Sequence, residues 1–434
     1  MRKLTVKNFS VIKDAELEFG KITVLIGPQS SGKSLLCKLA YFLSKEILEH
    51  AAGSILRGVT FGEFKSAIIG KFLKRFSAGF TESPYVVEFS ERLYSIKFYG
   101  QDGFPGGDIG CIFSEHFENL YTKLRSKIYV NAEIGGNPIL RAEDVVWTEL
   151  NLLLTDPVIL RSRYIPAGRA FFTNASMGIK VLRNPDIDPL VGDFAEMIKW
   201  NTPRLSHLPE QSQLIAARIQ TKILEIARGH VVGTSDSPVF MSEHNRPFPF
   251  TLLSSGTQEL LPLFNVLGQL VWDREGRVIF TEPEEGQQVQ RWPVWTKDLV
   301  YLEEPEAHIF PETQYELIRL FAWLSNEQTQ DFSWVITTHS PYILTAFNSL
   351  IEAWRVGNKV GKREHVAALI PEQYWVNEND FAAYSIRDGR LESIFKKETE
   401  GEEGSGLIDG NFLDSVSDSL GSEFDKLLDI EYAD

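Results

Sequence analysis

The first fifty residues show three successive patterns of apolar and polar positions. Residues 4–19 alternate apolar and polar side chains in two short segments, which predicts a half-exposed β-hairpin. Residues 22–27 form a continuous apolar run ending in glycine, as expected of a strand buried on both faces. From Lys33 onward, apolar residues recur on one helical face: Leu35, Leu36, Leu39, Phe42, Leu43 and Ile47. Residues 22–48 are therefore predicted to fold as strand, glycine-rich loop and helix.

Residues 50–250 give weaker patterns. Residues 85–103 are typical of a hairpin, and residues 114–128 of a helix. Residues 209–229 predict an amphipathic helix ending at Gly229. No heptad array is sustained, so the sequence does not support a long coiled-coil arm.

Two further apolar runs end in chemically active side chains. After Leu252, the segment 254–273 predicts a loop followed by a helix. Residues 300–302 predict a buried strand, which Glu303 and Glu304 follow directly. The run 332–339 predicts another buried strand, ending at Thr337, Thr338 and His339. Together with the strand, loop and helix at 22–48, these elements indicate an α/β fold.

Composition bounds the class of protein. A length of 434 residues suggests two or three lobes, and 43% hydrophobic residues is ordinary for a globular chain. No apolar run reaches 18 residues and the N-terminus has no signal-like apolar segment, so we expect neither membrane insertion nor secretion. Two cysteines, Cys37 and Cys111, are too few for a disulfide framework or a zinc site. A cytoplasmic location is expected.

Charge is unevenly distributed along the chain. The net charge is −15, and the last 44 residues carry −10 of it, with 13 acidic and 3 basic side chains. The remainder is close to neutral, so local basic patches are possible at 70–76, 123–128 and 160–169. For the first two, solvated helix faces and scattered arginines are the favoured explanation. Nucleic-acid binding is thus possible but not indicated.

The segment Gly27–Ser34, "GPQSSGKS", matches the P-loop pattern G-x-x-x-x-G-K-[ST]. It lies between a predicted strand and a predicted helix, where its N–H groups and the helix N-terminus can surround phosphate oxygens. Lys33 would neutralise the β- and γ-phosphates of ATP, and the Ser34 hydroxyl would bind Mg²⁺. The predicted nucleotide-binding residues here are Gly27, Pro28, Gln29, Ser30, Ser31, Gly32, Lys33, Ser34 and Leu35.

The paired acids gain a role beside a P-loop. Alone, Glu303 and Glu304 would be a solvated acidic loop after an edge strand. A P-loop, however, places Mg²⁺ and a triphosphate above the end of a neighbouring parallel strand. We therefore expect Glu303 to hold the metal through water, and Glu304 to orient or deprotonate the attacking water.

Four motifs follow in a fixed order: the P-loop, the loop "SSGTQ" (254–258), the strand with two acids, and the strand ending in His339. In this order the chain resembles the ABC-type ATPase heads shared by SMC proteins, RecF and the overcoming-lysogenisation-defect nucleases. The prokaryotic branch named AAA-15 or AAA-21 is most similar, through "LEEPEAH" (302–308) and the opening segment 4–19. The resemblance covers residues 1–48 and 250–345. It implies an ABC-type head with a mixed sheet flanked by helices, carrying an α/β insertion.

The resemblance also implies roles for individual residues. The segment 254–258 corresponds to the signature loop, so Ser255, Gly256 and Gln258 would contact ATP bound to a second subunit. His339 would be the switch histidine near the γ-phosphate, acting in catalysis with Glu304 and Lys33. His308 would lie in the loop that crosses the dimer seam, in either a structural or an interface role. Arg169 belongs to "RYIPAGR" (163–169), and is either a phosphate or partner contact or a structural arginine.

The chain also departs from the pattern of these relatives. Ser254 and Thr257 replace the usual leucine and second glycine, and Glu303 stands where transporters and SMC heads carry aspartate. A polar segment, 281–295, lengthens the distance from signature loop to acids. The glutamine of the Q-loop is not assignable, and Gln101 is only one candidate.

These observations predict an ATP-hydrolysing head that pairs with a second copy, with 1–50 and 251–397 forming the head, 51–250 an inserted lobe and 398–434 an acidic tail. The 95 residues after His339 contain no Asp-x-Asp pair, so no nuclease domain is apparent. The resemblance implies a separate effector, a nuclease or toxin, in bacterial anti-phage defence. The alternative is a RecF- or SMC-like DNA-repair ATPase that clamps DNA. The long insertion disfavours a transporter subunit.

Overall fold

A computed structural model describes residues 2–77, 83–100, 109–131, 146–150, 152–153, 159–173, 188–198, 210–234, 237–279, 295–327, 332–395, 406–409 and 422. Candidate Gln101, most of the polar segment 281–295 and nearly all of the acidic tail therefore lie outside the described residues. None of the helices in the described part combines the length and apolar character needed to cross a membrane.

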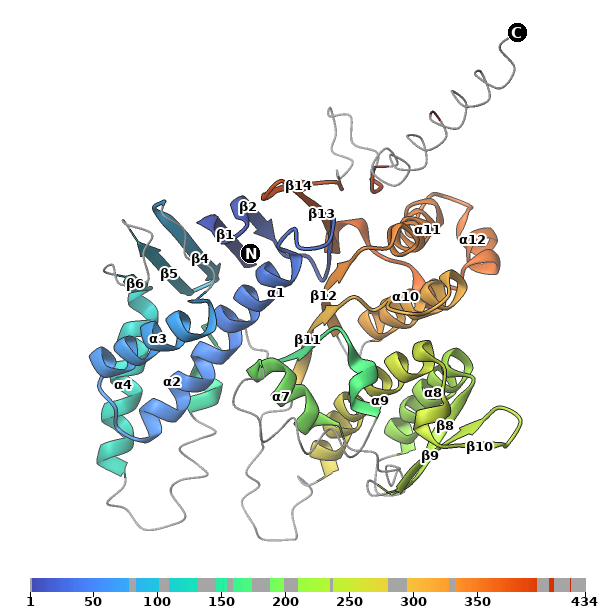
Figure 1. The fold of residues 1–434 in the computed structure, drawn as a ribbon, viewed down its shortest axis with the longest axis horizontal. Helices are drawn as coiled ribbons and strands as arrows, with labels where there is room; N and C mark the ends of the chain where they lie inside the picture. The colour runs from blue at the N-terminus through green and yellow to red at the C-terminus, as the bar shows by residue number, and fades with distance from the viewer. Residues whose placement is uncertain are drawn as a thin grey trace.

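Within the described residues, a central mixed sheet has the strand order β6-β5-β4-β1-β2-β14-β13-β3-β12-β11-β7 (Figure 1). Its strands are β1 (Arg2–Phe9), β2 (Ile12–Glu18), β3 (Ile22–Ile26), β4 (Tyr85–Glu91), β5 (Tyr94–Gly100), β6 (Gly110–Phe113), β7 (Ile159–Ile165), β11 (Trp295–Glu303), β12 (Phe332–Thr338), β13 (Phe381–Arg387) and β14 (Arg390–Ser393). A small separate sheet contains β8 (Gly229–Thr234), β9 (Ser237–Ser242) and β10 (Pro247–Phe248).

The helices are α1 (Lys33–Tyr41), α2 (Ile47–Leu56), α3 (Phe61–Arg75), α4 (Glu115–Asn131), α7 (Pro189–Met197), α8 (Glu210–Ala227), α9 (Ser255–Ile279), α10 (Pro311–Asn326), α11 (Pro341–Gly357) and α12 (Arg363–Leu369). A π-helical segment, η1 (Phe42–Glu46), joins α1 to α2. Single 3-10 turns are η3 (Arg169–Thr173), η5 (Phe250–Leu252), η6 (Glu372–Tyr374) and η7 (Glu378–Asp380). The predicted strand, loop and helix at 22–48 are confirmed, as are the predicted hairpins and the helix α8.

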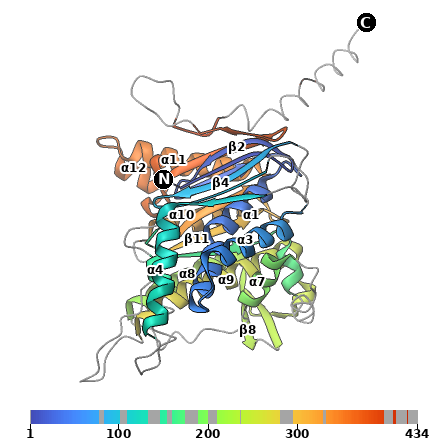
Figure 2. The same cartoon turned by 90° about the vertical axis from the view of Figure 1, so that its left-hand side faces the viewer.

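Two hydrophobic cores lie on the two faces of the sheet. Successive residues of β3 point to opposite sides, because Val24 packs in one core and Leu25 in the other. Helices α1 to α4 pack on one face, where they share a core with side chains of the antiparallel strands β1, β2 and β4 to β6 (Figures 1 and 2). Helices α9, α10 and α11 cover the other face. Because β3, β12 and the last part of β11 (299–302) are buried on both sides, their sequences are largely apolar runs.

The part of the sheet that carries the predicted motifs is parallel. Strands β7, β11, β12, β3 and β13 pair in parallel in that order, so their carboxyl ends meet at one edge. Glu303 at the end of β11 is paired with Thr337 of β12, and Thr338 with Ile26 of β3. This register brings the P-loop, the paired acids and His339 together.

The stretch 51–250 contributes to the sheet itself. Strands β4 to β6 extend its antiparallel end, and β7 is the edge strand beside β11. Helices α7 and α8 and the small sheet β8–β10 lie outside the central sheet. The predicted insertion therefore supplies one wall of the candidate site through β7 and the segment that follows it.

Candidate nucleotide site

The P-loop connects β3 to α1, and its two glycines are required by packing. Gly32 has a φ of 106°, and a Cβ atom there would lie 2.3 Å from Cδ1 of Ile12. A Cβ atom on Gly27 would lie 2.5 Å from the carbonyl oxygen of Ile386 in β13. Pro28, Gln29 and Ser30 are exposed, whereas Ser31, Ser34 and Leu35 are half-buried. The loop is thus held against β2 and β13 while its tip faces solvent.

Lys33 folds back into this loop. Its Nζ donates to the carbonyl oxygens of Gly27 and Pro28, at 2.8 Å each, and the residue is only 4% exposed. Burial lowers the pKa of Lys33, although the charges of Glu304 and Glu306 act in the opposite direction. A bound triphosphate would replace these two neutral carbonyl oxygens with charged phosphate oxygens. Charged oxygens are the stronger hydrogen-bond partners for an ammonium group.

The two adjacent acids have different environments. Glu303 is 5% exposed, and its Oε2 accepts from the N–H of Ala167 at 3.2 Å. Its Oε1 is buried with no hydrogen bond of normal geometry, beside the Tyr164 phenol, whose pKa is raised by burial and then by the Glu303 charge. Glu304 has a φ of 42°, and its N–H donates to Thr337 O at 2.9 Å. Because the backbone of Glu304 is left-handed, its side chain does not follow that of Glu303 into the interior. The Glu304 side chain is 34% exposed.

His339 joins Glu304 to Lys33. Its Nε2 is 3.1 Å from Oε1 of Glu304, and its Nδ1 is 3.5 Å from Nζ of Lys33. Because an ammonium can only donate, a contact with Lys33 Nζ requires Nδ1 to accept, and the Nε2–H of that tautomer would donate to the Glu304 carboxylate. The three side chains predicted to act in catalysis therefore form one continuous chain.

Two residues that support His339 were missed by the sequence reasoning. Oε1 of Glu306 accepts from Thr338 Oγ1 at 2.7 Å and from the N–H of His339 at 2.6 Å. Oε1 of Gln314 accepts from Ser340 Oγ at 2.6 Å. Glu306 could have been suspected, because it is a third acid in the same short motif. Nothing in the sequence around Gln314 indicates its role.

The predicted signature loop is the first turn of a helix. Ser254 caps α9 by accepting from the N–H of Thr257 at 3.2 Å, and Ser255 is exposed at the helix N-terminus. Gly256 packs so closely that a Cβ atom there would lie 2.7 Å from the carbonyl oxygen of His308. Nε2 of Gln258 donates to Phe250 O at 2.9 Å and to Leu253 O at 3.1 Å, so its amide is engaged within the chain. Among the described residues, no hydrogen bond joins Ser255, Gly256 or Gln258 to residues 27–35.

Arg169 is fully buried. Its guanidinium donates to carbonyl oxygens of both acids, Glu303 (2.6 Å) and Glu304 (2.9 Å), and of Pro166 (2.9 Å). Burial lowers the pKa of Arg169, while the adjacent Glu259 carboxylate acts to raise it. Of the two roles expected for Arg169, these contacts favour the structural one.

The residues present fit a magnesium ion held together with a nucleotide. Mg²⁺ is typically bound through one or two carboxylates, waters and substrate phosphates, and not in a cage of protein ligands. In the described part of the chain, no group of three or more His, Cys, Asp and Glu side chains is arranged to hold a metal. Glu303 offers an unpaired buried carboxylate oxygen, and Ser34 lies at the start of α1. These two would hold the ion.

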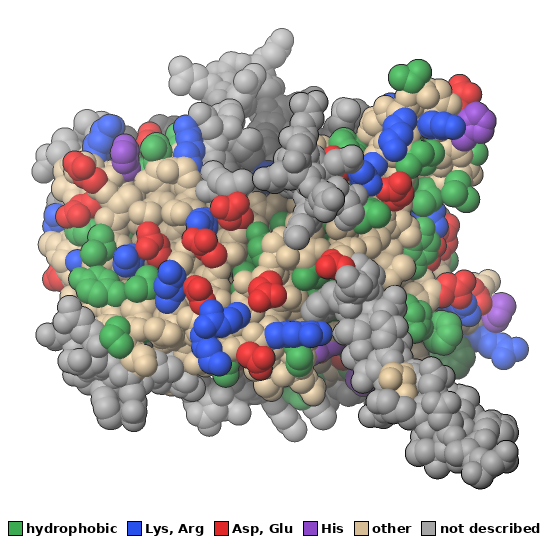
Figure 3. Space-filling view, turned by 90° about the horizontal axis from the view of Figure 1, so that it is seen from above, with side chains coloured by type: hydrophobic (Ala, Val, Ile, Leu, Met, Phe, Trp, Pro, Cys, Tyr) green, Lys and Arg blue, Asp and Glu red, His purple; other side chains and the backbone are tan. Residues whose placement is uncertain are grey.

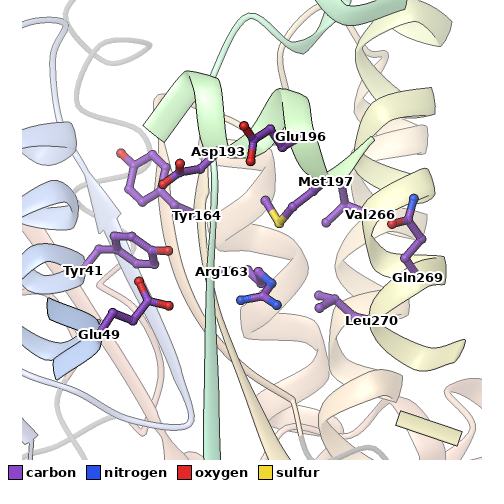
Figure 4. A pocket seen from close by; sticks show the side chains of 10 residues that line it. All are labelled: Tyr41, Glu49, Arg163, Tyr164, Asp193, Glu196, Met197, Val266, Gln269 and Leu270. Carbon is purple, nitrogen blue, oxygen red and sulfur yellow. The ribbon is translucent and has the colours of Figure 1, made fainter. Parts of the chain in front are cut away.

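A separate cavity of about 410 Å³ lies beside the edge strand β7 (Figure 4). Its polar lining includes Tyr41, Glu49, Arg163, Asp193 and Glu196. Burial raises the pKa of Asp193, and the nearby Glu49 raises it further. None of the residues lining this cavity belongs to the predicted nucleotide site.

Residues 22–345 match the family described as "AAA domain, putative AbiEii toxin, Type IV TA system". The chain belongs to this AAA-21 family. The match confirms the branch that the motifs predicted, and it includes the stretch 51–250, which the motif resemblance did not cover. No curated protein matches the chain.

Solved structures similar to this AAA-21 chain are SMC heads and an ABC cassette. An SMC head bound to the C-terminal winged-helix domain of ScpA is 11% identical, with a TM-score of 0.41, covering 90% of this chain and 96% of that one. The SMC head from Thermotoga maritima is 10% identical, with a TM-score of 0.35 and coverages of 90% and 97%. An ATP-binding cassette of an ABC transporter in its ADP conformation is 11% identical, with a TM-score of 0.31 and 90% of each chain covered.

Proposed function

We propose that this AAA-21 protein hydrolyses ATP with Mg²⁺ in sites completed by a second copy of the chain. The observation that carries the proposal is the chain of contacts from Glu304 through His339 to Lys33 at the mouth of the P-loop. Such a chain places a general base, a polar switch and a phosphate-binding cation within reach of one ligand.

The chemistry follows from these side chains. Lys33 neutralises the developing charge on the transferred phosphoryl group, and Glu304 accepts a proton from the attacking water. The water oxygen forms the new bond to the γ-phosphorus as the bond to the ADP oxygen breaks. Bound Mg²⁺ would supply further charge neutralisation on the β- and γ-phosphate oxygens. His339 holds Glu304 by hydrogen bonding to Oε1.

Pairing of two heads is supported by the position of Ser255. It is exposed at the N-terminus of α9, where free N–H groups and the helix dipole favour an anion. It makes no hydrogen bond to the P-loop residues of its own chain, as described above. A phosphate presented by a second head would satisfy this helix end.

The biological role that we propose is control of a separate effector, a nuclease or toxin, in anti-phage defence. The description of the matching family, "putative AbiEii toxin, Type IV TA system", supports a connection with toxin–antitoxin systems. That the effector is a separate protein is inferred from the motif resemblance alone. The peripheral elements α7, α8 and β8–β10 from the stretch 51–250 are the proposed partner-binding or lid region. Closing and reopening of paired heads would shift a two-state interface on which the effector depends.

A DNA clamp is disfavoured by where the basic residues lie. Two arginines of the candidate patch 160–169, Arg161 and Arg169, are buried on carboxylates and carbonyls of the chain. Basic and acidic side chains are interspersed over the face drawn in Figure 3. A duplex-binding surface requires a basic stripe and produces a steep salt dependence.

Mass measurement of the wild-type protein and of the Glu304→Gln variant, each with Mg·ATP, tests the proposal. We expect the variant to accumulate as a nucleotide-bound pair of chains and the wild type to return to its starting state as ATP is consumed. A variant that hydrolyses ATP normally would show that Glu304 is not the base. A Glu304→Gln variant that binds ATP but stays unpaired would contradict sites shared between two copies.

A further inference from the structure

Arg169 contacts both the end of β11, which carries the acids of the chain's own nucleotide site, and helix α9, which carries the predicted signature loop for the partner's site. Nη1 and Nη2 hold the carbonyl oxygens of Glu303 and Glu304, the residues at which the chain leaves β11. The backbone N–H of Arg169 donates to Oε2 of Glu259 at 2.9 Å, and its Nε lies 3.5 Å from the same oxygen. One residue therefore contacts both the catalytic segment and a side chain of α9.

Glu259 belongs to α9, the helix whose first turn is the predicted signature loop. It lies one turn after Ser255, and it is 3% exposed. A carboxylate and a guanidinium buried together with several hydrogen bonds have few alternative positions, because breaking the pair leaves an uncompensated charge. A shift of the first turn of α9 must therefore be passed to Arg169 or break this pair.

We propose that Arg169 and Glu259 form a buried link through which a partner's nucleotide, bound at Ser255 and Gly256, sets the position of Glu304 in the chain's own site. The inference rests on the proposed function, and it adds that the two sites of a pair are coupled within each chain. Both are positioning residues, since neither reaches the nucleotide.

The geometry at Glu304 makes its position sensitive to this link. The residue has a φ of 42°, and Thr337 O holds its N–H while Arg169 holds its carbonyl oxygen. A rotation of the peptide units on either side redirects the carboxylate that must accept the proton from water. A misplacement of about 1 Å of a catalytic group can cost up to about a hundredfold in rate.

Mixed pairs of full-length chains carrying two different affinity tags test the link. One chain carries Lys33→Ala, so its own P-loop stays empty, and the other chain keeps an intact P-loop. Turnover per intact site is compared with that of the corresponding pair with both P-loops intact, and pairing is verified by mass. Filling the second site should raise wild-type turnover per intact site about tenfold. We call the turnover per intact site with both P-loops intact, divided by that with one P-loop empty, the coupling ratio. With Glu259→Gln in the chain that hydrolyses ATP, the coupling ratio should fall to about one, with KM for ATP unchanged.

Asp298→Asn is the matched control. Asp298 forms a buried ion pair with Arg161, on β11 and β7, away from the strand ends that carry the site. Arg161 also donates to the carbonyl oxygen of Leu270 in α9, about four turns from the first turn that carries Ser255. Asp298→Asn, like Glu259→Gln, removes the charge of a buried carboxylate paired with an arginine, and so should lower the stability of the fold similarly. It should nevertheless retain the coupling ratio of the wild type. Arg169→Lys, which keeps the charge and loses the fork, should behave as Glu259→Gln does.

The outcomes separate the link from the function on which it rests. A wild type that neither pairs nor hydrolyses ATP overturns the proposed function and the link together. A wild type that pairs and shows coupling, with an unchanged ratio in Glu259→Gln, overturns the link alone. Equal loss of the ratio in Asp298→Asn also overturns it, because general destabilisation would then explain the effect.

Discussion

His339 lies between the proposed base and the phosphate-binding lysine, with Nε2 3.1 Å from Glu304 Oε1 and Nδ1 3.5 Å from Lys33 Nζ. The backbone N–H of His339 itself donates to Oε1 of Glu306, which is half-buried at the same strand ends. A nucleotide that draws Lys33 out of its two loop carbonyls changes one end of this chain of contacts. We expect the imidazole to pass this change to the carboxylate at the other end.

Glu304→Gln should abolish turnover and leave nucleotide binding intact. The amide retains the size of the side chain but cannot accept the proton, and loss of a general base typically costs about 10²- to 10⁴-fold. Phosphate release and the affinity for a fluorescent ATP analogue measure the two effects separately. Glu312→Gln, at the exposed start of α10, is the control and should match the wild type. Equal losses of binding and turnover would assign Glu304 to ligand binding.

His339→Ala should lower kcat for ATP about tenfold or more while KM changes little, because Glu304 loses the group that orients it. Steady-state kinetics at saturating Mg²⁺ measure both constants. His244, which is exposed, provides the control variant His244→Ala. An unchanged kcat would contradict a role for His339 in the reaction.

Ser255→Arg should spare ATP binding by a single head and block pairing. Ser255 is exposed at the start of α9, so a long cation there occupies the surface that meets a second head. Gly256 is a poorer choice, because any side chain there would collide with His308 within the same chain. Mass measurement with ATP and the Glu304→Gln background gives the readout, and Ser349→Arg on α11 is the exposed control. Normal turnover in Ser255→Arg would indicate a site complete within one chain.

The sequence predicts the parts of the site that local patterns encode. The buried strands were found because β3, β12 and residues 299–302 of β11 are covered on both faces and so appear as apolar runs. The P-loop helix was found because its apolar residues recur on one helical face. The pairing of β7 with β11 was not predicted, because more than a hundred residues separate them and register depends on tertiary packing.

Side-chain contacts that no local sequence pattern encodes explain the rest of what was missed. The role of Gln258 was inferred from resemblance alone, whereas its amide satisfies two carbonyls of the preceding turn. The Arg169–Glu259 pair joins residues 90 positions apart, which no local pattern reveals. Its buried charges are stable only because the fold supplies every partner.

ATP affinity should depend on pH through Lys33. Burial lowers the pKa of this lysine in the nucleotide-free protein, with Glu304 and Glu306 opposing the effect. Phosphates favour the ammonium, so the bound state has the higher pKa and binding takes up a proton between the two values. Affinity for an ATP analogue therefore falls as the pH rises through the lowered pKa, below the ordinary lysine value of about 10.4.

Calorimetry of analogue binding between about pH 8 and about pH 10, in buffers of different ionisation enthalpy, measures both the affinity and the proton uptake. Lys33→Arg keeps its charge throughout this range and should show weaker binding without the same pH dependence. Lys33→Ala should abolish binding, and retention of full affinity in that variant would contradict the P-loop assignment.

Glu303→Asp should weaken the use of Mg²⁺, although aspartate is the usual residue in transporters and SMC heads. In this chain Oε2 is engaged by the N–H of Ala167, and Oε1 alone remains for the metal's shell. Arg169 holds the carbonyl oxygen of residue 303, so the backbone cannot advance to compensate for a missing methylene. We expect the Mg²⁺ concentration for half-maximal ATPase activity to rise about tenfold, as when outer-shell support is lost. Nucleotide binding without Mg²⁺ should not change, and Glu312→Asp controls for the substitution itself. An unchanged Mg²⁺ titration would show that Glu303 serves to anchor the segment at Ala167 and not to hold the ion.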